Sequence, residues 1–285
     1  LPQDFVESAT IHGILSRGCA YHCKYCVEKT YWGSPRRYRL EKLLTEMSVL
    51  QKKYRTQMAG LEESMLDMRS KGFHEFCRRL THRGIELPEQ FYITTRIDAV
   101  TEDGVARLSS TGIGIVCVGI ESFSERVLTM MNKKQSPETI RQGCEKLKKK
   151  DIWTNTYWLI GHPGDNPREA QASYSKFRRF FEEGLLSSGH AFIFVPYPGT
   201  PFFSNPSRYG VMIDRYDWNR WRRWTDAPVS WLADFPAAEI RRAYDRAWRL
   251  LTSYRRMNTQ LRQASETFTK SMVSTAMRGG AGVLA

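Results

Sequence analysis

The chain has 285 residues, of which 41% are hydrophobic and 26% charged, a composition typical of a folded globular protein and not of a disordered one. No run approaches the roughly 18 apolar residues that a membrane-spanning helix needs, so the sequence excludes a transmembrane protein. Lys and Arg outnumber Asp and Glu by 43 to 30, but they are dispersed along the chain and indicate no single nucleic-acid-binding surface.

Short apolar segments rich in β-branched residues alternate with longer amphipathic segments. The short segments are expected to be strands at residues 11–16, 57–61, 91–95, 114–120, 156–160 and 191–195. Between them, the spacing of leucines predicts a helix over 40–50. Ser136 and Asn166, each followed by proline, are expected helix N-caps. Strands separated by helices in this way predict a parallel sheet with right-handed crossovers.

Polar or glycine-rich residues follow the carboxyl end of each expected strand. In chain order these are a cysteine-rich loop, Glu63, Arg96, Glu121 with Ser122, 161–165 and 196–201. An open doubly wound sheet would gather its chemistry at one switch point, whereas a barrel builds its site from all of the βα loops. We therefore expect an α/β fold in which residues 1–215 form a partial (β/α)6 barrel with parallel strands. Residues 216–285 are expected to form a Trp- and Arg-rich helical extension.

The cysteines fall into two groups. Three follow apolar helix or strand spacing and are expected in the core: Cys77, Cys117 and Cys144. The other three form one motif, Cys19-x3-Cys23-x2-Cys26. A structural zinc site needs four closed ligands, and no second cysteine pair is present. A 4Fe–4S cluster normally takes four cysteines, so three would leave one iron open to a substrate or cofactor. The open cluster is the favoured interpretation, with a zinc site or unligated core thiols as alternatives.

The cysteine motif, with Tyr25 just before its third cysteine, resembles that of the radical S-adenosylmethionine (SAM) superfamily. The resemblance continues in the expected order through about 200 residues, in segments 118–122, 127–133, 159–164 and 196–201. The last segment, Pro-Tyr-Pro-Gly-Thr-Pro, is similar to the sixth-strand loop of the subgroup that carries a cobalamin-binding domain upstream.

The resemblance implies a 4Fe–4S cluster held by Cys19, Cys23 and Cys26, with SAM bound to the open iron through its amine and carboxylate. Reduction of the cluster would then break a sulfur–carbon bond of SAM and produce a 5′-deoxyadenosyl radical. Tyr25 would lie near the adenine. No residue is assigned as a general acid or base.

The remaining cofactor contacts also come from the resemblance. Glu121, with Ser122 beside it, would bind the ribose hydroxyls, and Lys133 would pair with the methionine carboxylate where relatives often have Arg. Arg96 would reach the ribose or the carboxylate. Glu63 would bind the amine, although Glu62-Glu63-Ser64 lacks the glycines of the family pattern. Three residues on the last two strands complete the expected set: Leu159, Gly161 and Val195.

The expected function is cobalamin-dependent methylation, or ring formation, at an unactivated carbon of a natural product or peptide. The abrupt start at Leu1 predicts a cobalamin domain upstream of this chain. The alternative is a methylthiotransferase that acts on RNA. A less favoured alternative is a non-catalytic module whose fold is held by a bound metal. Expected partners are a small-molecule or peptide substrate and an external electron donor of the flavodoxin or ferredoxin type. No membrane partner is expected, and nucleic acid is kept open as the partner of the alternative function. Cysteine usage suggests a reducing, cytoplasmic location.

Overall fold

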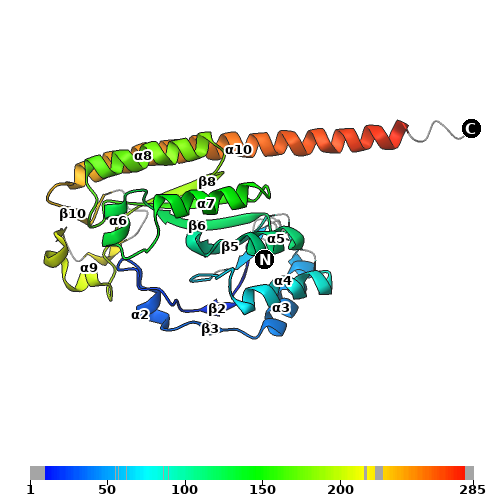
Figure 1. Ribbon diagram of the computed structural model, residues 1–285, viewed down its shortest axis with the longest axis horizontal. Helices are drawn as coiled ribbons and strands as arrows, with labels where there is room; N and C mark the ends of the chain where they lie inside the picture. Colours follow the sequence, from blue (N-terminus) through cyan, green and yellow to red (C-terminus); the bar gives the residue numbers. More distant parts are fainter. Residues whose placement is uncertain are drawn as a thin grey trace, which may run out of the picture.

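The chain folds around one parallel six-stranded sheet, as the computed structural model shows (Figure 1). The structure describes residues 10–54, 56, 58–61, 63–85, 87–88, 90–214, 217–221 and 227–279, with side chains of the last helix described through Asn258. The strands follow sequence order across the sheet: β1 (Thr10–Gly13), β4 (Met58–Leu61), β5 (Gln90–Arg96), β6 (Ile115–Glu121), β7 (Trp153–Ile160) and β8 (Ser188–Ile193). Within the described residues β1 and β8 do not pair, so the predicted partial barrel is confirmed.

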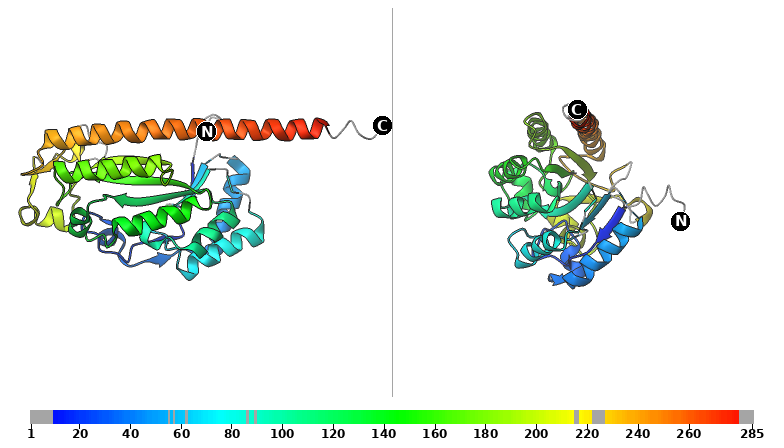
Figure 2. Two further views of the ribbon diagram at one scale, coloured as in Figure 1. Left: turned by 45° about the horizontal axis from the view of Figure 1, so that its top comes forward. Right: turned by 90° about the vertical axis from the view of Figure 1, so that its right-hand side faces the viewer.

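Helices cover the outer face of the curved sheet, which Figure 2 shows end-on in its right-hand view. They are α3 (Leu40–Tyr54), α4 (Lys71–Arg83), α5 (Glu102–Thr111), α6 (Glu125–Met130), α7 (Pro137–Lys148) and α8 (Pro167–Glu182). Both predicted N-caps are confirmed, because the side chains of Ser136 and Asn166 accept hydrogen bonds from backbone N–H groups in the first turns of α7 and α8.

The core lies between these helices and the sheet. On α8, Phe177 stacks on Trp158 of β7 with ring centroids 4.4 Å apart. The predicted core cysteines are confirmed as buried: Cys77 on α4, Cys117 on β6 and Cys144 on α7. The apolar residues therefore hold the strands in register, and the carboxyl ends of the strands carry the polar residues.

The first expected strand differs from the structure. Residues 11–16 are divided between β1 and a second strand, β2 (Ser16–Arg17), which pairs antiparallel with β3 (Arg36–Arg37). The carboxylate of Glu63 accepts hydrogen bonds from the backbone N–H groups of Leu15 and Ser16 at the turn between the two strands. This contact with a residue 47 positions away diverts the chain from the sheet, and local sequence spacing does not reveal it. The short helix α2 (Glu28–Trp32) lies between β2 and β3.

Beyond β8 the chain forms a small antiparallel pair and a long helix. The elements are α9 (Pro201–Ser204), η2 (Pro206–Tyr209), β9 (Val211–Ile213), η3 (Trp218–Arg220), β10 (Ser230–Leu232) and α10 (Ala237–Gly279). The β9–β10 pair was not predicted. Of the Trp- and Arg-rich segment, Tyr216, Arg222, Arg223 and Trp224 lie outside the described residues.

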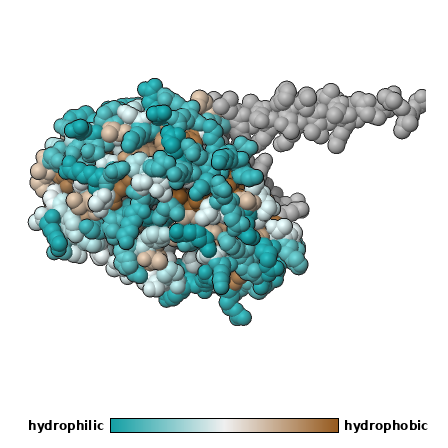
Figure 3. Space-filling view, viewed as in Figure 1, coloured by the Kyte–Doolittle hydropathy of each residue, from teal (hydrophilic) through white to brown (hydrophobic). Residues whose placement is uncertain are grey.

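The helix α10 runs beside α8 and then continues past the sheet (Figures 1 and 2). Tyr254 of α10 stacks on Phe181 of α8 with ring centroids 4.9 Å apart. The view in Figure 3 shows a largely hydrophilic face with small, separate hydrophobic areas. Within the described part of the chain, no helix is long and apolar enough to cross a membrane.

Candidate cofactor site

The cysteine loop lies at the carboxyl end of the sheet, against the turn that follows α6. Three hydrogen bonds position it without using a cysteine side chain: Cys19 N–H to Gly33 O (3.2 Å), Lys24 N–H to Met131 O (2.9 Å) and Asn132 Nδ2 to His22 O (2.9 Å). These bonds tie the loop to α2 on one side and to the β6–α7 connection on the other. Two backbone hydrogen bonds and the Asn132 side chain therefore place the three thiols beside the ends of the strands.

The three thiols of Cys19, Cys23 and Cys26 are partly exposed. Burial raises the pKa of Cys19, and it raises the pKa of Cys26 to about 11. A metal that binds here must therefore displace protons from these thiols. Among the described residues, no three His, Cys, Asp or Glu side chains converge as a site for a single metal ion. A four-iron cluster takes one thiolate per iron, so it does not require such convergence, and three thiols on one loop fit it.

A buried triangle of polar groups lies next to the loop. Lys133 Nζ is 3.0 Å from Glu121 Oε1 and donates to the Tyr25 hydroxyl at 2.9 Å. The Tyr25 hydroxyl lies 3.3 Å from the same Glu121 oxygen. The side chains of Lys133 and Glu121 are 3% and 11% exposed. Glu121 has a φ of 65° at the end of β6, where the pairing register with β7 shifts, and this turns its carboxylate toward the loop.

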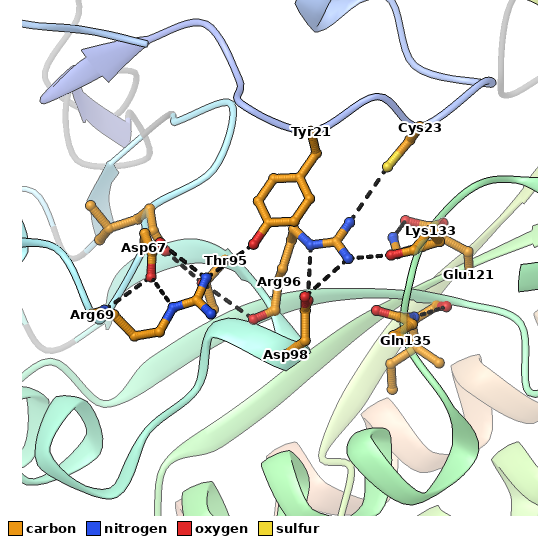
Figure 4. A network of polar contacts seen from close by, with 12 residues as sticks. Tyr21, Cys23, Asp67, Arg69, Thr95, Arg96, Asp98, Glu121, Lys133 and Gln135 are labelled. Carbon is orange, nitrogen blue, oxygen red and sulfur yellow. Dashed lines mark hydrogen bonds and ion pairs between the residues drawn. The ribbon is translucent and has the colours of Figure 1, made fainter. Parts of the chain in front are cut away.

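Arg96, at the end of β5, is held from several sides (Figure 4). Its Nε and Nη2 donate to the Asp98 carboxylate at 2.8 and 3.2 Å, and Nη2 also donates to the Lys133 carbonyl. Its Nη1 donates to Cys23 Sγ at 3.4 Å. The ring of Tyr21 covers the guanidinium at 4.0 Å. Arg96 thus joins the strand end, the cysteine loop and the turn that contains Lys133.

The predicted amine ligand, Glu63, is engaged within the protein. It is buried, and its carboxylate accepts hydrogen bonds from the backbone N–H groups of Leu15 and Ser16 and from the Ser16 hydroxyl. Burial raises the pKa of Glu63, and these hydrogen bonds oppose the rise. The neighbouring Glu62 lies outside the described residues. Glu63 therefore bonds to residues that shortly precede the cysteine loop. These contacts are separate from the Glu121–Lys133 pair.

Ser122 and Gly161 both make structural contacts with helices. The Ser122 hydroxyl is 3.0 Å from that of Ser173 on α8 and accepts a hydrogen bond from the Ser124 N–H. Gly161, with a φ of 80°, faces α10 so closely that an added Cβ would lie 2.8 Å from Ile240. The absence of a side chain at Gly161 is therefore required by helix packing in this structure.

Leu159 and Val195 occupy different surroundings. Leu159 is partly buried on β7 and lies on the opposite face from its neighbour Trp158, which packs against α8. Val195 follows β8 and packs with Trp221 and Val229 in a small apolar cluster of the carboxyl-terminal region. The structure thus brings together Cys19, Cys23, Cys26, Tyr25, Arg96, Glu121 and Lys133. The contacts described for the other expected residues are made with other parts of the protein.

The structure adds site residues that sequence reasoning did not assign. Tyr21 accepts a hydrogen bond from Arg69 at 3.0 Å, and Arg69 is paired with Asp67 at 2.8 Å. Tyr21 lies within the cysteine motif and Asp98 two residues after Arg96, so spacing was the only available signal for either.

Two buried titratable groups follow β7. His162 is fully buried, and burial lowers its pKa to about 3. Burial also raises the pKa of Asp165 to about 7.

Sequence comparison finds relatives of several activities. The chain is 23% identical to an uncharacterized methyltransferase of Pyrococcus horikoshii, covering 82% of this chain and 50% of the relative. It is 24% identical to the bacteriochlorophyllide d C-12(1)-methyltransferase of Chlorobaculum tepidum, covering 73% and 44%. It is 26% identical to the tRNA-2-methylthio-N(6)-dimethylallyladenosine synthase of Deinococcus radiodurans, covering 68% and 40%. The chain therefore spans half or less of the length of these relatives.

Solved structures share the fold. The radical SAM methyltransferase TsrM of Kitasatospora setae, determined with cobalamin and a 4Fe–4S cluster bound, superposes with a TM-score of 0.63 at 17% identity, covering 84% of this chain and 47% of that one. The cobalamin-dependent SAM radical enzyme OxsB gives 0.53 at 17% identity, covering 62% and 27%. The model of the Radical SAM superfamily matches residues 14–177, more than half of the chain. With the three-cysteine loop at the carboxyl end of a parallel sheet, this match shows that the chain belongs to the radical SAM superfamily, whose cofactors are a 4Fe–4S cluster and SAM.

Proposed function

We propose that this chain holds the 4Fe–4S cluster through Cys19, Cys23 and Cys26 and binds SAM beside it. The observation that carries the proposal is the placement of the cysteine loop directly against two buried ion pairs, Lys133–Glu121 and Arg96–Asp98. The bound cluster and SAM supply a one-electron cleavage of SAM to methionine and a 5′-deoxyadenosyl radical.

The residues of the triangle suit a zwitterionic nucleoside ligand. Lys133 offers a positive charge to the methionine carboxylate, and Glu121 offers an anionic acceptor to the ribose hydroxyls. Without a ligand, Lys133 and Glu121 form an ion pair with charged atoms 3.0 Å apart. SAM would bind by replacing Glu121 as the partner of Lys133 and Lys133 as the partner of Glu121. The Tyr25 hydroxyl contacts both members of the pair and holds them at the edge of the loop while they exchange.

The other expected contacts remain predictions. Glu63 can reach the SAM amine only by sharing hydrogen bonds it now makes with Ser16. Ser122, Leu159, Gly161 and Val195 lie at or after the carboxyl-terminal parts of β6, β7 and β8. Contact of any of them with the adenosine is a proposal to be tested by SAM binding to variants.

The proposed reaction is cobalamin-dependent methylation, or ring formation, at an unactivated carbon of a small molecule or peptide. Its support is the similarity to two methyltransferase sequences and the shared fold of the two cobalamin-dependent structures described above. Cobalamin would be the methyl carrier and would be bound by a region outside this chain. A protein of the flavodoxin or ferredoxin type would supply the electron.

The test is anaerobic reconstitution with iron and sulfide, followed by SAM and dithionite, with mass spectrometric detection of 5′-deoxyadenosine. Product is expected from the wild-type chain and is expected to be absent from Cys23→Ala. The matched control is Cys77→Ala, because Cys77 is buried on α4 and should leave both cluster and product unchanged. A reconstituted chain that binds zinc and not iron, or a cluster that forms without any cleavage of SAM, would refute the proposal.

A methylthiotransferase acting on tRNA is the second candidate. It is favoured by the 26% identity to the Deinococcus radiodurans enzyme and is compatible with the net charge of +13. Binding of unmodified tRNA should then weaken steeply as salt rises, because basic residues would release counterions from the phosphates. Specific, saturable tRNA binding would favour this candidate, and its absence would favour a small substrate.

A further inference from the structure

We propose that Arg96 is a positioning residue that sets the reduction potential of the cluster by donating a hydrogen bond to the sulfur of Cys23. The inference rests on the proposed function, because it requires the cluster to be held by the cysteine loop. It differs from the expected role of Arg96 as a ligand of SAM. The side chain that would face the cofactor carboxylate instead directs an N–H at a cluster ligand.

The orientation of the guanidinium is fixed by its other partners. Nε and Nη2 are occupied by the Asp98 carboxylate, and Nη2 also by the carbonyl of Lys133. Because the guanidinium is planar, these contacts leave Nη1 pointing toward the cysteine loop, where it lies 3.4 Å from Cys23 Sγ. The Arg96 side chain is 8% exposed, so water screens this contact weakly.

Tyr21 closes the remaining side of the guanidinium. Its ring lies over Arg96 at 4.0 Å, and its hydroxyl is fixed by Arg69 (Figure 4). Tyr21 and Cys23 belong to the same short loop, so any movement of Arg96 relative to the loop breaks two contacts at once.

The sign of the effect follows from the charge of the cluster. One electron taken from the external donor makes the cluster and its thiolates more negative, and an N–H donor beside a ligating sulfur stabilises that more negative state. Loss of the donor should therefore make the midpoint potential more negative. The bond is present in both oxidation states, so only its strengthening on reduction shifts the potential. A strengthening that changes the equilibrium about tenfold is a shift of ~59 mV for a one-electron couple.

The experiment is an EPR-monitored redox titration of the reconstituted chain without SAM, with dithionite and low-potential viologens as reductant and mediators. Omitting SAM separates this role from any contact with the methionine carboxylate. Arg96→Gln should lower the ratio of reduced to oxidised cluster about tenfold at a fixed potential. Arg96→Lys should lower it by about threefold, because an ammonium cannot satisfy Asp98 and Cys23 together.

The matched control is Arg107→Gln. Arg107 on α5 pairs with Asp103 through Nε at 2.8 Å, as Arg96 pairs with Asp98. Its side chain is 40% exposed, so removing its charge should change the ratio by less than about twofold. Iron and sulfide content are measured for every variant.

A loaded Arg96→Gln cluster with the wild-type potential overturns the inference, and so does an equal shift in Arg107→Gln. If Arg96→Gln fails to hold a cluster, Arg96→Lys decides by the same criterion. A wild-type chain that assembles no cluster would instead refute the proposed function, so the two failures are distinguishable.

Discussion

The buried pair of Lys133 and Glu121 allows a quantitative test of the site before any cofactor is added. Their side chains are 3% and 11% exposed, and their charged atoms are 3.0 Å apart. Lys133→Met removes one charge and leaves Glu121 without its counterion, which for buried pairs costs about 3–5 kcal/mol of unfolding free energy. Glu121→Gln should cost a similar amount, because it leaves the Lys133 ammonium buried without its counterion. In the double variant neither charge is left alone, so it should cost less than either single variant.

The assay is urea unfolding of the cofactor-free chain, followed by far-UV circular dichroism, for the wild type, both single variants and the double variant. The expected coupling free energy is at least about 2 kcal/mol. The matched control is the helical pair Arg178–Glu182, whose side chains are 59% and 46% exposed. Arg178→Met should leave the unfolding free energy almost unchanged, because water screens an exposed pair. Strictly additive losses for Lys133 and Glu121 would show that they do not form a desolvated pair, and the assignment of both to one ligand site would lose its basis.

Three further predictions concern pH, backbone conformation and metal removal. Burial raises the pKa of Asp165 from 3.8 to about 7, so the contribution of Asp165 to stability should fall by up to about 4 kcal/mol between pH 4 and 7. Buried His162, whose pKa is lowered to about 3, contributes the opposite slope below pH 6.5, so the Asp165 contribution is read from the difference between the wild type and Asp165→Asn. In urea titrations, Asp165→Asn should cost more unfolding free energy at pH 5 than at pH 7.5. At Gly18, where φ is +90°, an added Cβ would lie 2.6 Å from the Ser34 carbonyl oxygen, so Gly18→Ala should lose bound iron. The control is Gly112→Ala, where φ is +77° and the space around the Cβ is open. This variant should keep its iron and lose only about 1 kcal/mol of unfolding free energy. Chelation of iron from the loaded chain should leave the far-UV spectrum unchanged, because the three hydrogen bonds described above hold the cysteine loop without metal; loss of helical signal would contradict this.

The sheet could be predicted from the sequence because its signals are local. β-branched runs mark the strands, and proline after Ser136 or Asn166 marks the helix starts. The alternation of strand and helix, together with polar residues after every strand, was enough to favour a partial barrel over an open sheet. The three-cysteine spacing was enough to identify a candidate cluster, because thiolates on one tight loop have few other uses.

The contacts within the site could not be predicted, because they join residues far apart in the chain. Arg96 reaches Cys23 across 73 positions, and Glu63 reaches Ser16 across 47. Spacing showed that Arg96 and Glu63 lie at strand ends, but not whether each faces the ligand or another part of the protein. The contact between Gly161 and Ile240 also joins residues far apart in the chain. A glycine that lets a ligand approach and a glycine that lets a helix approach look the same in the sequence, so the sequence could not distinguish them.

Both cations at the centre of the site have their own carboxylate, and this arrangement bears on how a charged ligand can enter. A lone buried Lys133 or Arg96 would pay a large desolvation cost in the cofactor-free chain. Attraction to Glu121 and to Asp98 offsets part of that cost while keeping both cations in place. The two pairs differ in how firmly they are held: Asp98 receives two hydrogen bonds from Arg96, whereas Lys133 and Glu121 share one contact. A ligand with both a carboxylate and hydroxyl donors can replace each partner of the looser pair without changing the net buried charge. The Lys133–Glu121 pair is therefore suited to exchange with a ligand, and the Arg96–Asp98 pair to remain fixed beside the cysteine loop.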